Sequence, residues 1–294
     1  MNLITRFDFD GIVSAVMIYK MENIADISFS DPKFIEEGEV LDLLNPGDII
    51  AHLPFHPDAG MWFHNHDTSQ IDPELLKNVK GKYGEASSTS RQVFEYYNSP
   101  DLKRYVPIIK EVDRIATADL TKEDITAPKG WIMVAYTVDP RFYPEHTYAM
   151  MIMNSIMSGK APEEILQLPP VAKRVQLYQA DEERYVEELK KNSRLDGKVI
   201  ITDFREVARS PRGNRFTAFV HFPAGNVQIR LQSGAGNRVK VSIGKSIFNR
   251  TCKANIGHLM EEYGGGGMAG AGTCVVSKAS ADEKLKEIVK KLNI

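Results

Sequence analysis

Short, continuous apolar runs alternate with longer stretches of helical periodicity in the first half of the chain. The runs predict buried strands, because the strands of a parallel sheet are covered on both faces; they cover residues 3–7, 27–30, 48–54 and 61–63. Residues 12–21 are apolar nearly all round and predict a buried helix. Two more helices are expected, after the hydroxyl-rich residues 87–90 and over residues 101–118. This alternation predicts a doubly wound parallel sheet.

The pattern changes towards the C-terminus. A charged helix over residues 171–191 follows several prolines and predicts a connector. From residue 198 most apolar positions alternate with polar ones, as in half-solvated strands; the predicted strands cover residues 199–202, 216–222, 227–231, 239–243 and 274–276. A last helix is predicted after a capping box of Ser280 and Glu283, and its buried face consists of Leu285, Ile288, Val289 and Leu292.

These patterns predict an α/β protein with two domains, which its length of 294 residues also favours. The N-terminal domain is a doubly wound parallel sheet, the smaller C-terminal domain is mixed α+β, and a cleft is expected between them. The predicted limits are residues 1–160 for the first domain, 161–197 for a helical connector and 198–294 for the second domain.

Composition argues against several classes of protein. With 43% hydrophobic and 26% charged residues, the profile is that of an ordinary globular protein. The net charge of −2 argues against a dedicated duplex-DNA binder. We expect no secretory signal and no membrane span, because charges interrupt the first apolar run and the longest apolar stretch is short. Two cysteines without a disulfide framework indicate the cytoplasm.

Polar side chains that can bind metals follow three of the predicted strands. Asp8 and Asp10 follow the first strand, His52 ends the second, and the run His64-Asn65-His66-Asp67 follows the third. The carboxyl ends of parallel strands meet at one edge of a sheet, where ligands bind. Two carboxylates so close together repel each other unless a cation lies between them, which indicates a divalent metal. The alternatives are turn chemistry around Asp10 and a solvated loop at the histidines.

Asp113 lies beside the buried stripe of the helix predicted over residues 101–118. If it faces inward, it is a candidate for a further acid at the same site. Its spacing fits a solvated helix carboxylate equally well. Both interpretations stay open from the sequence alone.

Residues that could hold an anion gather in the C-terminal half. Six glycines lie among the nine residues 264–272, and such an unobstructed backbone suits a phosphate or a carboxylate, with a flexible linker as the alternative. The segment is not a Walker loop, because no Lys-Ser/Thr pair follows at that spacing. Basic side chains in this half would attract anions if they shared one face: Arg205, Arg209, Arg212, Arg215, Arg230, Arg238, Lys240, Lys245 and Arg250.

The order of these segments resembles the DHH phosphoesterase superfamily with its DHH-associated C-terminal domain, and most of all its bacterial exopolyphosphatase-like and nanoRNase-like members. The matching segments are residues 5–15 for the first motif, 48–54 for the second, 62–69 for the Asp-His-His motif, Asp113 for the fourth, and 242–251 and 264–273 for the substrate-binding segments. The resemblance covers nearly the whole chain.

The resemblance implies a phosphohydrolase that cleaves phosphodiester or phosphoanhydride bonds with one or two Mn²⁺ ions or another divalent metal. The implied metal ligands are Asp8, Asp10, His52, His64 and Asp113. The implied catalytic residues are His66, beside the scissile phosphate, and Asp67. The implied substrate-binding residues are Arg6, Lys245, Asn249, Arg250, Gly265, Gly266 and Gly267. Short oligonucleotides, nucleotides or polyphosphate are the implied substrates.

Several positions depart from the family pattern. His52 replaces a bridging aspartate, and its loss removes the anion that would hold two cations together. A site with more nitrogen ligands suits one softer transition metal. The other departures are Arg6 in place of a frequent histidine, Asn65 within the altered Asp-His-His motif, and Lys245 and Met268 in place of two histidines common in the second domain.

Two functions therefore stay open. One is a cytoplasmic metal-dependent phosphohydrolase, which the retained Asp8, Asp10, Asp113 and His66 favour. The other is a catalytically degenerate protein that binds or senses phosphorylated ligands or nucleotides on the same scaffold. The expected partner is a small phosphorylated substrate, with a short single-stranded oligonucleotide included. We expect no membrane partner, and a homodimer is compatible with the sequence.

Overall fold

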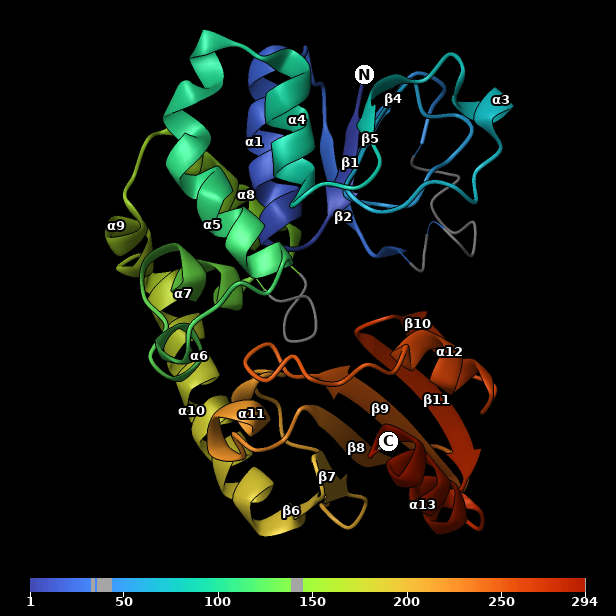
Figure 1. The fold of residues 1–294 in the computed structure, drawn as a ribbon. Helices are drawn as coiled ribbons and strands as arrows, with labels where there is room; N and C mark the ends of the chain where they lie inside the picture. The colour runs from blue at the N-terminus through green and yellow to red at the C-terminus, as the bar shows by residue number, and fades with distance from the viewer. Residues whose placement is uncertain (33–34, 36–43, 139–144, 294) are drawn as a thin grey trace. The chain divides into compact units, whose positions relative to one another are not determined.

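The computed structural model describes residues 1–32, 35, 44–138 and 145–293. The chain forms two compact units (Figure 1). Unit 1 contains Met1–Leu120 and Pro128–Gln176, and unit 2 contains Thr121–Ala127 and Leu177–Ile294. The division falls inside the long helix α10 (Pro169–Asn192), so the segment predicted as a connector contributes to both units.

Unit 1 is built on a five-stranded parallel sheet with the order β2-β1-β3-β4-β5. The strands are β1 (Leu3–Arg6), β2 (Ile27–Ser30), β3 (Ile49–Ala51), β4 (Met61–His64) and β5 (Lys80–Tyr83). The predicted parallel sheet is confirmed. Strand β5 was not predicted from the sequence, because this edge strand has the mostly polar sequence Lys-Gly-Lys-Tyr and lacks an apolar run.

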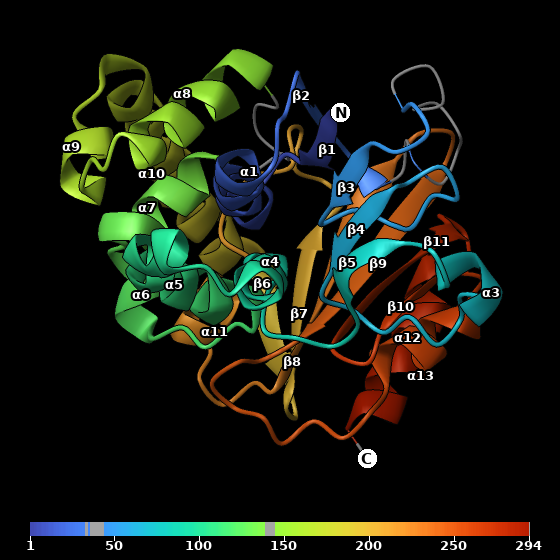
Figure 2. The same ribbon diagram turned by 90° about the horizontal axis from the view of Figure 1, so that it is seen from above.

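Helix α1 (Phe9–Met21) is the centre of unit 1, and its residues Phe9–Ile18 are all buried, as its apolar character predicted. Figures 1 and 2 show α1, α4, α5 and α8 on one side of the sheet and α3 on the other. The remaining helices of unit 1 are α3 (Pro73–Leu76), α4 (Thr89–Tyr97), α5 (Val106–Ala116), α7 (Gly130–Thr137), α8 (His146–Met157), α9 (Pro162–Leu166) and the 3₁₀ helix η1 (Pro100–Tyr105). The single helix predicted over residues 101–118 is therefore η1 followed by α5, with Pro107 in the first turn of α5.

Alternate strand residues pack against opposite faces of this sheet. Leu3, Ile49 and Phe63 belong to the core on the helix side, whereas Ile4, Ile50 and Trp62 belong to a second core with Leu53. Both faces are thus covered, which explains the continuous apolar runs of the sequence. Because β1, β3 and β4 run parallel, the residues that follow them lie at one edge of the sheet.

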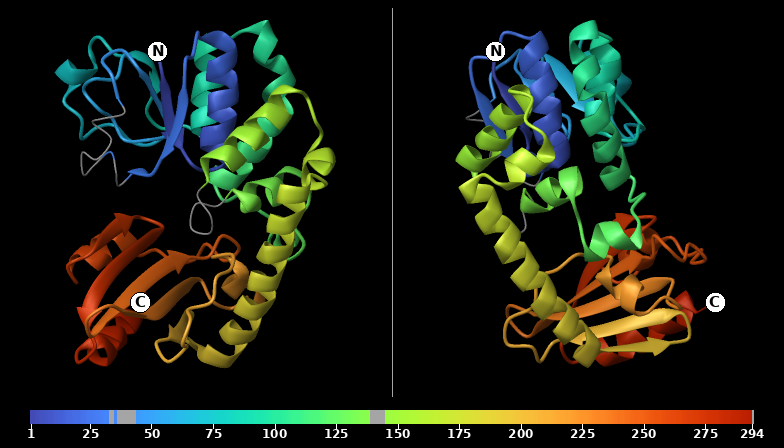
Figure 3. Two further views of the ribbon diagram at one scale, coloured as in Figure 1. Left: turned by 180° about the vertical axis from the view of Figure 1, so that it is seen from behind. Right: turned by 90° about the vertical axis from the view of Figure 1, so that its left-hand side faces the viewer.

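Unit 2 contains a six-stranded mixed sheet with the order β10-β11-β9-β8-β7-β6. The strands are β6 (Ser193–Asp196), β7 (Val199–Phe204), β8 (Val227–Gly234), β9 (Arg238–Lys245), β10 (Gly266–Met268) and β11 (Ala271–Ser277), and only β7 and β8 among these neighbours pair in parallel. Figure 3 shows α13 (Ala281–Leu292) along this sheet. The side chains of α13 and α12 (Ile256–Glu261) close the core together with one face of the strands. The predicted mixed α+β architecture is confirmed.

Two local predictions in unit 2 are wrong. Residues 216–222, predicted as a strand, form helix α11 (Thr217–His221), and the Glu182 carboxylate accepts hydrogen bonds from Thr217 Oγ1 and, at 2.7 Å, from Asn214 N–H near its start. The predicted capping box of α13 is not formed, because the Ser280 hydroxyl interacts with Ser277 instead. The remaining short helix of unit 2 is α6 (Lys122–Thr126). Within the described residues, no helix is both long and apolar enough to span a lipid bilayer.

Candidate active site

Asp8 connects β1 to α1. Its Oδ1 accepts a hydrogen bond from the N–H of Gly11 at 2.8 Å and so caps the helix. A Cβ atom at Gly11 would lie 2.1 Å from the carbonyl oxygen of Arg6, so this sharp turn requires glycine. The second oxygen, Oδ2, lies 3.1 Å from Arg6 Nε and 3.2 Å from His52 Nε2. Burial opposes the charge of Asp8, but His52 and Arg6 outweigh it and lower the pKa of Asp8 to about 2.

Asp10 is held by the start of helix α4. Its Oδ1 accepts hydrogen bonds from the N–H of Ser90 at 2.8 Å and from the Ser90 hydroxyl at 2.5 Å, and its Oδ2 accepts from the N–H of Thr89 at 2.9 Å. Asp10 is 7% exposed. A helix N-terminus stabilises a carboxylate through its free N–H groups and its dipole. Asp10 is therefore fixed in place without any ligand.

His52 lies between these two carboxylates. Its Nδ1 is 3.5 Å from Asp10 Oδ2 and 2.8 Å from Thr89 Oγ1. Burial opposes a charge on His52, yet the attraction of Asp8 and Asp10 outweighs burial and raises the pKa of His52 to about 9. The ring is thus a cation at neutral pH. The sequence predicted His52 at this edge of the sheet, and the structure brings it to Asp8 and Asp10.

Thr89, Ser90 and Asn65 also belong to the site. The Thr89 hydroxyl donates a hydrogen bond to Asn65 Oδ1 at 2.9 Å, so it accepts from the Nδ1–H of His52. We call Asp8, Asp10, His52, Thr89 and Ser90 the carboxylate cluster. The sequence indicated the hydroxyl groups of residues 87–90 as helix caps, and Ser88 does cap α4. No sequence pattern indicated that Thr89 and Ser90 would contact Asp10 and His52, because these partners are distant in the chain.

His64 and His66 lie next to the carboxylate cluster. The His64 ring stacks on Trp62, and its centroid is 5.1 Å from that of His66. His64 Nδ1 is buried without a hydrogen-bond partner among the described residues. Burial, together with His66 and His52, lowers the pKa of His64 to about 4. The exposed His66 lies 6.5 Å from His52 between ring centroids, and burial and the charge of His52 lower its pKa. Both rings are therefore neutral at pH 7.

Asp113 reaches the start of α4 but not the two other acids. Its Oδ1 accepts a hydrogen bond from Ser88 Oγ at 2.6 Å. Its Oδ2 accepts from Arg91 Nε at 3.1 Å and from Arg91 Nη2 at 2.5 Å. Asp67 is exposed and accepts hydrogen bonds from the N–H and hydroxyl of Ser69, which is the geometry of a local turn. The roles predicted for Asp67 and Asp113 stay predictions.

The arrangement of these side chains does not fit a metal ion. Among the described residues there is no group of three or more His, Cys, Asp or Glu side chains that could hold one. The carboxylate oxygens of Asp8, Asp10 and Asp113 are in contact with donors or cations of the chain. Metal ligation by Asp8, Asp10, His52, His64 and Asp113 stays a prediction from the resemblance.

In unit 2, the substrate-binding residues predicted after β9 form a tight turn. The buried Ser246 hydroxyl accepts hydrogen bonds from the N–H of Phe248 at 3.2 Å and of Asn249 at 2.9 Å. Asn249 Nδ2 donates to the carbonyl of Ala224 at 3.3 Å. Arg250 is exposed, and its Nε donates to the carbonyl of Ile247 at 3.1 Å. These contacts fix the turn, and the side chain of Arg250 can meet a ligand.

The glycine segment is a β-hairpin and not an open loop. We call residues 264–273, with β10 and the start of β11, the glycine hairpin. A Cβ atom at Gly265 would lie 2.1 Å from the carbonyl oxygen of Thr273, and one at Gly267 would lie 2.3 Å from that of Ala271. No atom lies within 4 Å of a Cβ at Gly266. Close backbone packing thus explains Gly265 and Gly267, whereas Gly266 is free of such a constraint.

Three of the basic residues in this half share one face of the unit 2 sheet. Arg230 on β8 is paired with Ser242 on β9, so the β9 residues Arg238 and Lys240 lie on the same face as Arg230. Arg205 instead forms ion pairs with Asp203 at 2.6 Å and Asp282 at 2.8 Å. The predicted basic face is therefore smaller than the count of arginines and lysines indicated.

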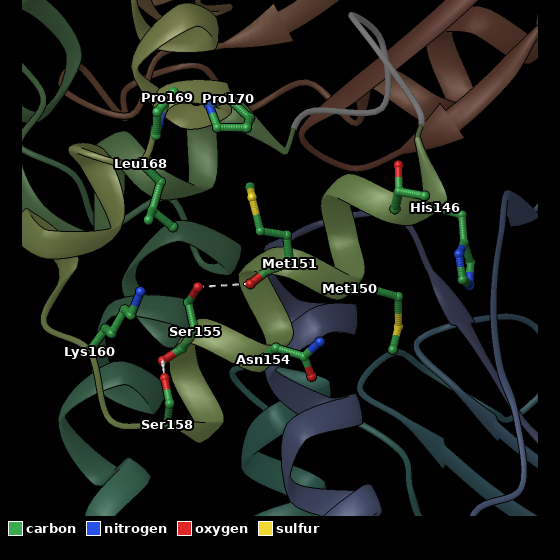
Figure 4. A pocket seen from close by; sticks show the side chains of 11 residues that line it. His146, Met150, Met151, Asn154, Ser155, Ser158, Lys160, Leu168, Pro169 and Pro170 are labelled. Atoms are coloured by element: carbon green, nitrogen blue, oxygen red, sulfur yellow. Dashed lines mark hydrogen bonds between the residues drawn. The ribbon is translucent and has the colours of Figure 1, made fainter.

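A separate surface pocket lies in unit 1, along α8 and the start of α10 (Figure 4). Its volume is about 630 Å³, and its lining includes Met150, Met151 and Lys160. The Ser155 hydroxyl in it donates to the carbonyl of Met151 at 2.8 Å. None of the site residues predicted from the sequence lines this pocket, so we assign it no part in the chemistry.

Known proteins of the same fold were found among solved structures. The chain is similar to the pGpG-specific phosphodiesterase PggH from Vibrio cholerae, with 30% identity, a TM-score of 0.84, and coverage of 99% of this chain and 98% of that one. It is also similar to an exopolyphosphatase-related protein from Bacteroides fragilis, with 13% identity, a TM-score of 0.51, and coverage of 99% and 91%.

RecJ from Thermus thermophilus, in complex with Mn²⁺, shares the fold at 11% identity and a TM-score of 0.60, over 99% of this chain and 51% of RecJ. No protein-family model matches the chain, and no curated protein matches it. At such low identity RecJ and the Bacteroides protein inform the fold alone, whereas PggH is similar in sequence over nearly its whole length.

Proposed function

The chain belongs to the DHH phosphoesterase superfamily, and from this premise we propose that it hydrolyses the phosphodiester bond of a short linear nucleotide. The family and the hydrolase class predicted from the sequence are confirmed. The observation that carries the proposed substrate is the 30% identity with a pGpG-specific phosphodiesterase over 99% of this chain. A 5′-phosphorylated dinucleotide is accordingly the substrate class that we propose.

His66 is the side chain best suited to meet the scissile phosphate. It is exposed at the edge of the carboxylate cluster, and its lowered pKa keeps the imidazole neutral at pH 7. A neutral imidazole can accept a proton from an attacking water molecule or hydrogen-bond to a phosphate oxygen. We propose this role for His66, and the exposed Arg250 in unit 2 as a partner for a terminal phosphate.

The proposal also covers the cofactor and the location. The resemblance implies Mn²⁺, but the described side chains do not fit an ion, so we assign no step of the reaction to a metal. Cys252 and Cys274 are free, in line with the reducing cytoplasm in which we place the protein. A homodimer stays a prediction.

The paired carboxylates favour a second candidate function. In DHH chemistry as the resemblance implies it, carboxylates bind cations, yet here Asp8 and Asp10 contact His52 and the start of α4. A protein with this arrangement could bind a linear dinucleotide and report its presence without cleaving it. This candidate is the phospho-ligand binding protein that the sequence left open.

One experiment separates the two candidates. The full chain is incubated with pGpG, with and without added Mn²⁺, and the products are separated by chromatography, while calorimetry measures pGpG binding. We expect conversion of pGpG to mononucleotides, reduced about a hundredfold in His66→Ala and unchanged in the matched control His56→Ala. Binding without conversion would support the second candidate, and neither binding nor conversion would contradict both.

A further inference from the structure

The His52 ring lies between the two carboxylates, in the place where the repulsion of Asp8 and Asp10 led us to expect a divalent cation. Its Nε2 is 3.2 Å from Asp8 Oδ2, and its Nδ1 is 3.5 Å from Asp10 Oδ2. A transition metal lies about 2.0–2.2 Å from its oxygen ligands. An ion that bridged these two oxygens could not be present together with the ring in this position.

The chain holds this ring in place from two sides. The backbone of His52 has φ 57°, and its N–H donates to the carbonyl of Phe63 at 2.9 Å. A left-handed conformation is uncommon outside glycine and persists where the surroundings determine it. On the ring, Nδ1 contacts Thr89 Oγ1 at 2.8 Å, and Thr89 in turn donates to Asn65. His52 is 9% exposed, so the ring is a built part of the site.

The other donors around the carboxylates complete this arrangement. Asp10 accepts three hydrogen bonds from Thr89 and Ser90, and Asp8 accepts one from Gly11 and lies against Arg6. Together with the His52 ring, these groups contact the oxygens of both carboxylates and orient them. The oxygens to which the sequence assigned a metal are therefore already in contact with groups of the chain.

We propose that His52 takes the place of a metal ion in this chain, so that the carboxylate pair is formed and held without a divalent cation. The proposal goes beyond the proposed function, because it concerns how the site is built. It holds whether or not the chain cleaves a nucleotide.

Metal binding to the full-length chain tests this proposal without any substrate. Calorimetric titration with MnCl₂ is combined with thermal unfolding in the presence of EDTA or of Mn²⁺. For the natural chain we expect no saturable binding of Mn²⁺ below millimolar concentration, and the same unfolding temperature in EDTA and in Mn²⁺. Micromolar binding, or a fall of the unfolding temperature in EDTA, would overturn the proposal.

The variant His52→Asp exchanges the ring for a carboxylate. We expect its affinity for Mn²⁺ to rise by about tenfold or more, equivalent to about 1.4 kcal/mol, and Mn²⁺ to raise its unfolding temperature. The matched control His56→Asp introduces the same carboxylate near Asp58, outside the cluster, and should leave both measurements unchanged.

Three carboxylates without a counter-ion could prevent His52→Asp from folding. In that case the experiment uses His52→Asn, which removes the ring without adding a charge. We again expect Mn²⁺ to raise the unfolding temperature of this variant. No response to Mn²⁺ in the folded variant would overturn the role given to His52. Because no nucleotide is present, these results are independent of whether the proposed hydrolysis is found.

Discussion

In the carboxylate cluster of unit 1, the oxygens of Asp8 and Asp10 are in contact with donors or cations of the chain. Around the glycine hairpin of unit 2, by contrast, Arg250 and Gly264 are exposed, and Met268 is 68% exposed. The acids and His52 of the first region had been predicted to bind metal ions, and the second region had been predicted to bind the substrate. The carboxylates of the first region are satisfied within the chain, whereas the second region exposes the Arg250 guanidinium and the apolar Met268 side chain to solvent.

The difference shows that clustered charge alone does not identify a ligand site. A helix N-terminus stabilises a carboxylate beside it, and a buried carboxylate that loses its cationic partner destabilises the fold. Exposed donors on a rigid turn contribute little to stability and are available to an anion. Stability should therefore respond to changes at buried contacts, such as those of His52, and ligand affinity to changes of exposed side chains, such as that of Arg250.

The largest effect is expected for His52→Ala. The change leaves the half-buried Asp8 and the buried Asp10 without the imidazole that contacts both of them, which should lower the free energy of unfolding by about 3 kcal/mol. Urea denaturation followed by circular dichroism measures this. His56→Ala, in the same loop but paired with Asp58, should change it by less than about 0.5 kcal/mol. Equal effects of the two variants would contradict the stabilising role of His52 in the carboxylate cluster.

Within the glycine hairpin, Gly265→Ala should lower the free energy of unfolding by about 2 kcal/mol, because the new Cβ would meet the carbonyl of Thr273. Gly266→Ala is the matched control, and its Cβ meets no atom within 4 Å, so we expect a change within about 0.5 kcal/mol. Urea denaturation of both variants measures the free energy of unfolding. A large loss of stability in Gly266→Ala would contradict this packing of the hairpin.

Asp48, directly before β3, has a carboxylate that is satisfied by amides instead of a cation. It accepts hydrogen bonds from the N–H of Asn2 at 2.7 Å and of Asn45 at 2.9 Å. Burial opposes its charge, but these amides lower its pKa below the ordinary 3.8. Its stabilisation is therefore present above pH 3.8 and is lost as the pH falls through the lowered pKa.

Asp48→Asn should thus cost about 1.5 kcal/mol of unfolding free energy at pH 7. Denaturation at a series of pH values should show the difference from the natural chain shrinking below pH 3.8. A difference that does not depend on pH would mean that the charge of Asp48 has no part in its hydrogen bonds. Only His52→Ala would then test whether a satisfied carboxylate stabilises unit 1.

The smallest effect is expected for Arg250→Ala, which tests unit 2 as the ligand-binding region. If the exposed guanidinium meets a phosphate, the dissociation constant of pGpG should rise about fivefold and depend less steeply on salt. Calorimetry at two salt concentrations measures both. Lys278→Ala, an exposed cation before α13, is the control and should not alter binding. Unfolding temperatures of both variants should match that of the natural chain.

Much of the fold could be predicted, because burial leaves a direct trace in the apolar pattern. The runs that became β1, β3 and β4, and the nearly all-apolar α1, were found in this way. The polar edge strand β5 and the short helix α11 were not, since neither carries an unambiguous period. Residues 216–222 form a short, mostly apolar run that could be a strand or a helix, and their tertiary contacts, among them those with Glu182, accompany the helix.

The site was predictable only in part. The rule that parallel strands deliver their following residues to one edge located Asp8, Asp10 and His52 together. It could not show that His52 would enter the space between the acids, because that depends on its backbone conformation and on Thr89. The many glycines of residues 264–272 suggested a loop that binds an anion. In the structure, Gly265 and Gly267 instead allow close packing of the backbone.

The left-handed backbone of His52 has a consequence for how such a site could change over time. Asparagine, aspartate, histidine and glycine are the residue types that tolerate this conformation best. Of these residue types, histidine has an imidazole that fills the space between the acids, and aspartate has a carboxylate that can bind a metal. Glycine has no side chain and leaves this space empty. Substitution of this one residue could therefore change the site from one that is held without a metal ion to one that requires a metal ion. The backbone conformation would stay the same.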